Sequence, residues 1–347
     1  MAGYAGKKQD QENGAYQNLR DDLKAGTPER LYVFYGEERY LLEDAVARLR
    51  AMIPEETREF NHRRLDGKNL GIDALREVVD ALPVFADRTL AEIWDYDLGK
   101  MGEETRKDIL RILSDIPDYT TVVFVFDTVE YKLDGRVKEN AELKKLLTEV
   151  EFTVRSDYDL ARWLTKNFAA GGKRLERDAA ARLIEMTGGL MTSMKTEVEK
   201  LTAYVTGGTV TVRDVEAVVT PTPEAAIWEL TDALLSRKND LAMARLGELL
   251  LMDEAPHRIL FGIAQKLRQL LTAKIRLQDR VDMKEYMKLA NVRFEFQARA
   301  LFDAARRTEM DRCVRYVELA ADTALRLNST SGDDRALLTE LAVRLLA

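Results

Sequence analysis

The spacing of apolar residues along the chain changes character near residue 155. Before that point, short runs rich in β-branched and aromatic residues alternate with stretches of helical periodicity, and the clearest runs are Leu31–Tyr35 and Thr120–Asp127. Continuous apolar runs of this kind are typical of buried strands in a parallel sheet. We predict further strands at 59–66, 89–94 and 151–154. The pattern therefore predicts an α/β domain in the first part of the chain.

Beyond that point the apolar residues recur at helical spacing almost without a break. Four short helices are expected within 157–219, and the Thr220–Pro223 segment (TPTP) is the best candidate for a linker before a series of longer helices. The predicted fold class is α/β plus all-α, with an α/β domain, a small helical domain and an all-helical domain at 1–155, 156–221 and 222–347. Residues 1–13 are polar and are predicted to be a loose arm before a short helix at 16–23.

The first strand and its following helix have the layout of a phosphate-binding loop, since a strand, a glycine turn and a helix open many nucleotide-binding domains. The motif G-x-x-x-x-G-K-[ST], started at Gly36, requires glycine, lysine and a hydroxyl where the chain has Leu41, Leu42 and Glu43. Two glutamates in the turn would also repel a phosphate. We therefore predict a degenerate phosphate loop and no cofactor. A plain strand-to-helix turn of another α/β fold is the alternative.

An active ATPase or nucleotide kinase would need a pair of acidic residues after the second apolar strand. That strand ends in the single acid Asp127, followed by Thr128 and Val129. Magnesium-dependent phosphoryl transfer requires a metal-binding acid together with a phosphate-binding lysine. We interpret Asp127 as a cap at the end of the strand, and we expect no catalytic residue.

The segment Leu82-Pro83-Val84-Phe85 places large apolar residues in a connection between a helix and a strand. Proline disfavours helical geometry in the residue before it, so the helix should end there. Taken alone, these side chains are expected to plug the core, because large apolar residues are buried more often than not. If they are exposed instead, they would mark a protein interface.

Composition excludes several classes of function. Lys and Arg number 53 and Asp and Glu number 60, giving a formal net charge of −7, which argues against strong autonomous DNA binding. The single cysteine, Cys313, and the two distant histidines, His62 and His257, predict neither a disulfide nor a metal site. No apolar run has the roughly 18 residues of a membrane span, so we expect a cytoplasmic protein without membrane partners.

Six stretches of the chain together resemble a known family, the delta subunits of the bacterial DNA polymerase III clamp loader. Their order and approximate spacing carry the resemblance, which extends over nearly the whole length. The stretches are VFYGEERYLL (33–42), LPVFADRTL (82–90), LDGRVKENAELKKLL (133–147), GGLMTSMKTEVEKLTAY (188–204), PEAAIWELTDALL (223–235) and LNSTSGDDRALLTELAVRLL (327–346).

The resemblance implies a particular architecture and task. It implies an AAA+-like α/β domain, a helical lid and a helical collar that builds a ring with the delta prime and gamma/tau subunits. Such a chain would bind and open the ring-shaped sliding clamp (the beta subunit) on primed DNA without hydrolysing ATP, as part of a DNA-directed DNA polymerase (nucleotidyltransferase) holoenzyme. A helical adaptor whose working part is residues 224–347 is the alternative.

The resemblance also changes the interpretation of two sets of residues. Residues 82–85 fall where the family has its hydrophobic clamp-binding wedge, so exposure becomes the favoured expectation. The best-known wedge is a Leu-Phe pair, whereas this chain has Val84 in the first position. Weak contacts with primed DNA are conceivable on one long collar helix, although a solvated helix face is the favoured interpretation. Its four basic residues are Lys266, Arg268, Lys274 and Arg276.

Overall fold

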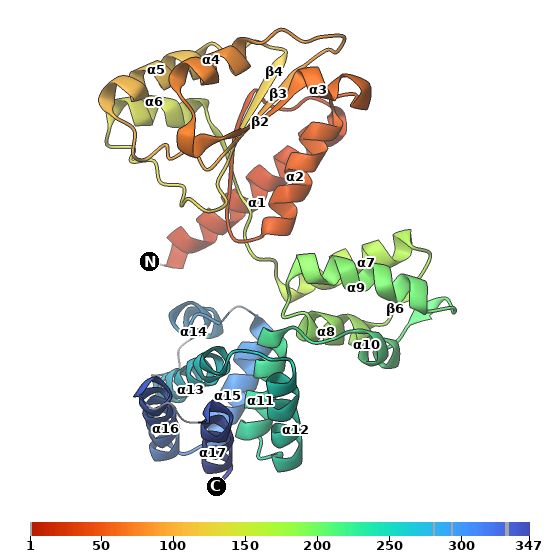
Figure 1. Cartoon of the computed structure of the whole chain (residues 1–347), viewed down its shortest axis with the longest axis vertical. Helices are drawn as coiled ribbons and strands as arrows, with labels where there is room; N and C mark the ends of the chain where they lie inside the picture. The colour runs from red at the N-terminus through yellow and green to blue at the C-terminus, as the bar shows by residue number, and fades with distance from the viewer. Residues whose placement is uncertain (1, 280–281, 293, 330–332) are drawn as a thin grey trace. The chain divides into compact units, whose positions relative to one another are not determined.

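The computed structural model describes residues 2–279, 282–292, 294–329 and 333–347. The chain divides into two compact units, Met1–Val154 and Arg155–Ala347. The first is a layered α/β unit and the second is almost entirely helical (Figure 1). The predicted fold class, α/β plus all-α, is confirmed. The further division of the second unit near residue 221 stays a prediction.

A parallel sheet of five strands forms the centre of the first unit. The strand order is β2-β3-β4-β1-β5, and every neighbouring pair is parallel. The two strands with the clearest apolar runs, β1 and β4, pair directly with each other inside the sheet, where both faces are covered. The strands are β1 (Leu31–Tyr35), β2 (His62–Asp66), β3 (Thr89–Trp94), β4 (Thr120–Val125) and β5 (Thr148–Glu151).

Helices cover both faces of this sheet (Figure 1). On one face, α4 (Ile72–Asp80), α5 (Glu103–Ser114) and α6 (Lys138–Leu146) bury apolar side chains against Val33, Ile93 and Phe124. On the other face lie α1 (Ala2–Ala25) and α2 (Arg39–Ala51), whose apolar stripe is buried. The four-residue helix α3 (Arg58–Asn61) directly precedes β2.

Three expectations for the first unit are wrong. Helix α1 begins at Ala2, where a loose arm and a shorter helix are predicted. The strand predicted at 59–66 starts only at His62, because the preceding residues form α3. The last strand is β5, three residues earlier than predicted. It is an edge strand in which only Val150 is apolar, so it has no apolar run to mark it.

The second unit begins with a small group of elements. Glycines follow its first two helices: Gly172, Gly188 and Gly189 all have positive φ, a conformation that suits glycine. Between the helices, two short strands pair in parallel. The elements are α7 (Asp157–Ala170), β6 (Arg174–Leu175), α8 (Arg177–Met186), α9 (Met191–Tyr204), β7 (Thr209–Val210) and α10 (Val212–Val218).

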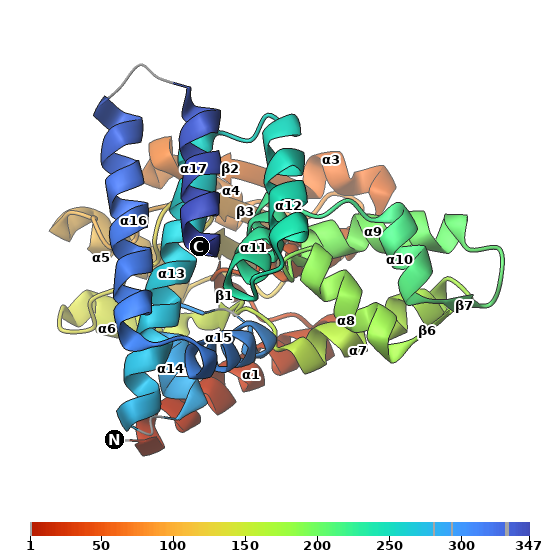
Figure 2. The ribbon, with the colours of Figure 1, turned by 90° about the horizontal axis from the view of Figure 1, so that it is seen from below.

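Longer helices complete the second unit around a separate apolar core. Figure 2 shows α13 and α16 lying side by side, with α17 next to α16. These helices are α11 (Pro223–Leu235), α12 (Asn239–Leu251), α13 (Pro256–Asp279), α14 (Met283–Leu289), α15 (Glu295–Arg307), α16 (Met310–Ser329) and α17 (Asp334–Leu346). The helical spacing of apolar residues predicts one stretch over 293–326 with a break near 307–310. The break lies between α15 and α16, and residue 293 lies outside the described residues.

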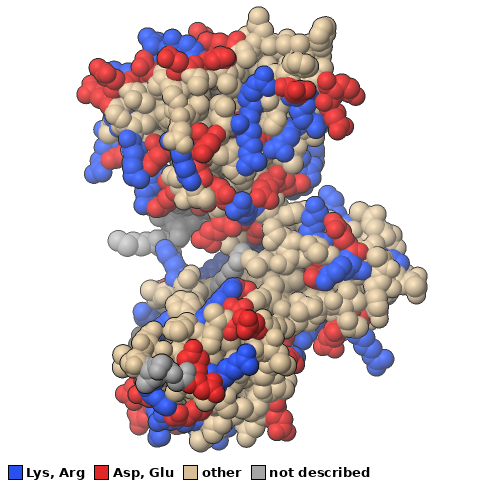
Figure 3. Space-filling view, in the orientation of Figure 1, with Lys and Arg blue, Asp and Glu red and all other residues tan. Residues whose placement is uncertain are grey.

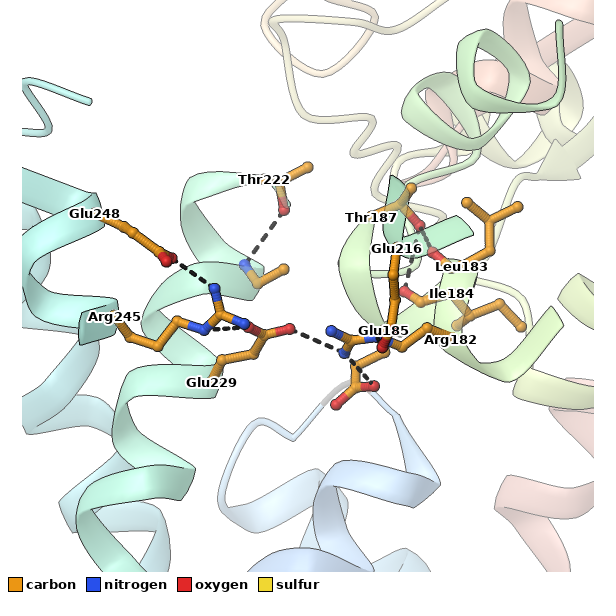
Figure 4. Close-up of polar contacts among 11 residues, drawn as sticks. Arg182, Leu183, Ile184, Glu185, Thr187, Glu216, Thr222, Glu229, Arg245 and Glu248 are labelled. Atoms are coloured by element: carbon orange, nitrogen blue, oxygen red, sulfur yellow. Dashed lines mark hydrogen bonds and ion pairs between the residues drawn. The ribbon is translucent and has the colours of Figure 1, made fainter. Parts of the chain in front are cut away.

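A chain of ion pairs joins α8 to α11 and α12 (Figure 4). One carboxylate oxygen of Glu229 lies 2.9 Å from Arg182 Nη1, and the other lies 2.9 Å from Arg245 Nε. Thr222 also accepts a hydrogen bond from the Ala225 N–H and so caps α11. Within the described residues, no helix is long and apolar enough to span a membrane.

Candidate functional site

The 82–85 loop lies between α4 and β3, at the end of the sheet where the parallel strands begin (Figure 1). Its apolar side chains face solvent: Phe85 is 93% exposed, Leu82 72% and Val84 39%. This exposure contradicts the core-plug interpretation. A folded chain gains nothing in its own core from side chains held this way, so the loop is a candidate protein-binding surface.

The loop is held from inside by one buried amide. Asn61 Oδ1 accepts a hydrogen bond from the Val84 N–H at 2.7 Å, and Asn61 Nδ2 donates to the Val84 carbonyl at 2.8 Å. The next residue, Phe85, has a φ of +51°, in the left-handed region. That region costs a residue with a side chain roughly 1–2 kcal/mol, so its neighbours must hold it there.

The far end of the loop is also fixed. The Arg88 guanidinium donates to the Gly26 carbonyl at 3.3 Å, and the Thr89 N–H donates to the Tyr119 carbonyl at 2.8 Å as β3 begins. Because both ends are tied to the α/β unit, the apolar side chains project from a fixed base.

Sequence reasoning misses two residues near this loop, the exposed Phe60 and the buried Asn61. Phe60 is 55% exposed on α3 and directly precedes the asparagine that holds Val84. The sequence predicts that both residues lie in a strand, where alternation places one of them on a covered face. The available signal for this site is the uncharged Phe-Asn pair within a segment of otherwise mostly charged residues.

The Gly36 turn lies at the opposite end of the sheet, where β1 ends. Gly36 has a φ of +128°, and a Cβ there would lie 2.4 Å from the Phe152 carbonyl oxygen. The Glu38 N–H donates to that same carbonyl at 2.8 Å. Leu41 and Leu42, at the predicted degenerate positions, are both buried in the core. The turn therefore packs against the chain after β5, and its Glu38 N–H is already bonded to that segment.

The acid at the end of β4 is engaged by a side chain. Arg39, at the start of α2, lies 2.7 Å from a carboxylate oxygen of Asp127 and 2.8 Å from Glu43. The arginine thus bridges Asp127, which follows β4, and Glu43, which stands where a phosphate loop has its metal-binding hydroxyl. Among the described residues, no group of His, Cys, Asp and Glu has the arrangement of a metal site.

A second carboxylate fills the backbone donors just beyond β4. Asp95 accepts hydrogen bonds from the N–H groups of Asp127, Thr128 and Val129 at 2.9, 2.8 and 3.1 Å, and from the Thr128 hydroxyl at 2.6 Å. Burial raises the pKa of the Asp95 carboxyl, but these four hydrogen bonds outweigh it and lower the pKa to about 2. Successive backbone N–H groups of this kind can hold an anion, and here they hold the chain's own carboxylate.

The four basic residues of α13 do not form one surface. Lys266 is buried with its ammonium group over the Trp228 ring, and burial lowers the pKa of this lysine well below its usual range. Both interpretations offered for it, a DNA contact and a solvated face, are wrong. Arg268 is exposed, Arg276 is half-buried, and Lys274 donates to the Ala305 carbonyl at 3.1 Å. On the face drawn in Figure 3, basic and acidic side chains are interspersed on each unit.

Comparison with known families identifies the chain. A model of "DNA polymerase III, delta subunit" matches residues 32–153, and a model of "DNA polymerase III delta subunit, C-terminal domain" matches residues 224–345. Together the two matches cover more than half of the chain. The chain belongs to the DNA polymerase III delta subunit family, as the resemblance predicted.

Individual relatives agree with this assignment. The DNA polymerase III subunit delta of Bacillus subtilis (strain 168) is 25% identical over 335 residues, covering 93% of this chain and 95% of the relative. A probable DNA polymerase III subunit delta of Aquifex aeolicus (strain VF5) is 23% identical over 280 residues, covering 77% of each. The solved Bacillus subtilis DNA clamp loader delta protein (YqeN) has a similar fold, with a TM-score of 0.66, 22% identity and coverage of 95% of this chain and 99% of that one.

Proposed function

We propose that this chain is the clamp-loader subunit that binds the DNA sliding clamp through the 82–85 loop and opens it, without hydrolysing ATP itself. The single observation that carries the proposal is the fixed exposure of Phe85, Leu82 and Val84. The names of the relatives supply the class of complex. The expected partners are the sliding clamp, the delta prime and gamma/tau subunits, and primed DNA within the assembled loader.

The proposed binding energy comes from apolar burial. Each fully buried side chain of this size contributes roughly 1.5–3 kcal/mol, and a few such anchors dominate typical interfaces. Phe85 is the main anchor, because almost all of its surface is available to a partner. Phe60, which precedes Asn61 in sequence, is a further exposed apolar side chain of the same unit. Opening the clamp then requires only that this surface bind the open form more tightly than the closed form.

The proposed absence of ATP hydrolysis rests on the residues at the carboxyl ends of β1 and β4. A phosphate loop needs free backbone donors and a lysine. Here the chain has Leu42 in place of the lysine, the Glu38 N–H bonded to Phe152, and Asp127 paired with Arg39. ATP would act through partner subunits.

The test is binding of the full chain to the sliding clamp of the same organism, measured by surface plasmon resonance. A Val84→Ala/Phe85→Ala variant should lose at least 100-fold in affinity, since two anchors are removed. Leu146→Ala is the matched control, because Leu146 lies on α6 of the same unit and, like Val84, is 39% exposed. It should bind like the wild type. Equal binding by all three would refute the proposed surface.

A further inference from the structure

We propose that Asn61 is a positioning residue that holds the 82–85 loop in its clamp-binding conformation. This inference rests on the proposed function of the loop. Asn61 itself is buried and does not face a partner, so it would act only through Val84. Its role would be to prepare the loop before the clamp arrives.

The geometry requires an amide at this position. Asn61 accepts from the Val84 N–H, donates to the Val84 carbonyl, and donates to the Thr57 carbonyl at 2.9 Å. An aspartate would keep the acceptor but lose both donors, and it would place a charge beside two carbonyl oxygens. An alanine would lose all three hydrogen bonds. Only the asparagine side chain fits the pattern.

The backbone next to Asn61 is hydrogen-bonded into the sheet. The next residue, His62, starts β2 and pairs with Leu90 of β3, so the amide is fixed to the sheet from one side and to the loop from the other. Two hydrogen bonds to one residue restrain both φ and ψ around Val84, immediately before Phe85 enters the left-handed region. Without them the loop would sample many conformations, and binding would bear the entropy cost of ordering it.

The test compares three variants of the full chain by two measurements. Asn61→Ala and Asn61→Asp remove the restraint. Asn140→Ala is the matched control: Asn140 is also buried in the first unit, and its Nδ2 donates to the Asp134 carbonyl at 3.1 Å, bracing a different loop. The measurements are clamp affinity by surface plasmon resonance and the hydrogen-exchange rate of the Val84 amide by NMR, with the Leu90 amide as an internal reference for the sheet.

We expect both Asn61 variants to exchange the Val84 amide at least tenfold faster, to leave Leu90 protected, and to bind the clamp about tenfold more weakly. Asn140→Ala should change neither quantity. Combining Asn61→Ala with Val84→Ala/Phe85→Ala should add no further loss. If Val84 exchange accelerates while clamp affinity stays at the wild-type value, the positioning role is overturned and the proposed function stands. If the Val84→Ala/Phe85→Ala variant itself binds like the wild type, the proposed function falls, and this inference with it.

Discussion

Among single residues, two side chains are exposed or buried contrary to what their chemistry predicts. Phe85 is apolar and exposed, whereas Lys266 is a lysine and buried. Pattern alone assigns the opposite state to each, because apolar residues are usually inside and lysines almost never fully so. The first departure marks the candidate interface. The second removes a candidate DNA contact.

Enlarging Val84 should strengthen clamp binding. Val84→Leu adds one methylene to a side chain that is already partly exposed in the loop, and a buried methylene contributes about 0.8 kcal/mol. We expect about a threefold to fourfold gain in affinity by surface plasmon resonance. The same change at another exposed valine, Val343→Leu in α17, should have no effect. Weaker binding by Val84→Leu would mean that the receiving pocket is matched to valine.

Asp95 should make the stability of the first unit depend on pH below 4. Its pKa is about 2 in the folded chain, below the ordinary value of about 3.9, so its contribution is fully present above pH 4 and is lost as the pH falls through 2. Asp95→Asn should lower the free energy of unfolding by about 1–2 kcal/mol at pH 7, with the difference shrinking towards pH 2. Urea unfolding at both pH values measures this, and a difference independent of pH would contradict it.

At the scale of elements, the sequence predicts the type of most helices and strands but not the connections that form the site. The runs at β1 and β4 are recognisable because they are buried on both faces. The edge strands β2 and β5 lack that signal, and the four-residue helix α3 is too short to show a helical period. The hydrogen bonds between Asn61 and Val84 join residues 23 positions apart, which no local pattern reveals. Only the family resemblance indicated that the loop is exposed.

Glycine at position 36 should be essential to the turn after β1. Gly36→Ala would place a Cβ 2.4 Å from the Phe152 carbonyl oxygen at a φ of +128°. We expect a loss of more than about 2 kcal/mol in the free energy of unfolding, measured with urea. Gly135→Ala is the control, because its Cβ would meet only Lys144 Cδ, at 3.9 Å. If both variants lost the same free energy of unfolding, the close approach to Phe152 would not be the cause of the loss in Gly36→Ala.

The ion pairs centred on Glu229 should couple α8 to α11 and α12. Glu229→Ala removes the carboxylate shared by Arg182 and Arg245, both of them largely buried, and should cost about 2 kcal/mol. Glu248→Ala removes only a more exposed partner of Arg245 and should cost less than about 1 kcal/mol. Urea unfolding followed by the fluorescence of the adjacent Trp228 distinguishes the two. Equal small losses would mean that apolar packing alone joins these helices.

At the scale of the whole molecule, the chain combines an α/β unit that keeps a nucleotide-binding layout with a helical unit. In the first unit, the polar groups at the carboxyl ends of the strands pair with other groups of the chain. At the amino ends of the strands, the 82–85 loop exposes apolar side chains to solvent. A sequence with mixed charge and a formal net charge of −7 fits recognition of a protein better than autonomous recognition of DNA. We therefore propose that binding through the 82–85 loop is sufficient to open the clamp.

The most direct measurement is release of fluorescently labelled sliding clamp from nicked circular DNA by the isolated full chain, in EDTA and without nucleotide. We expect the wild-type chain and Leu146→Ala to accelerate release, and Val84→Ala/Phe85→Ala not to do so. Release that requires ATP and magnesium, or that the Val84→Ala/Phe85→Ala variant supports as well as the wild type, would contradict it.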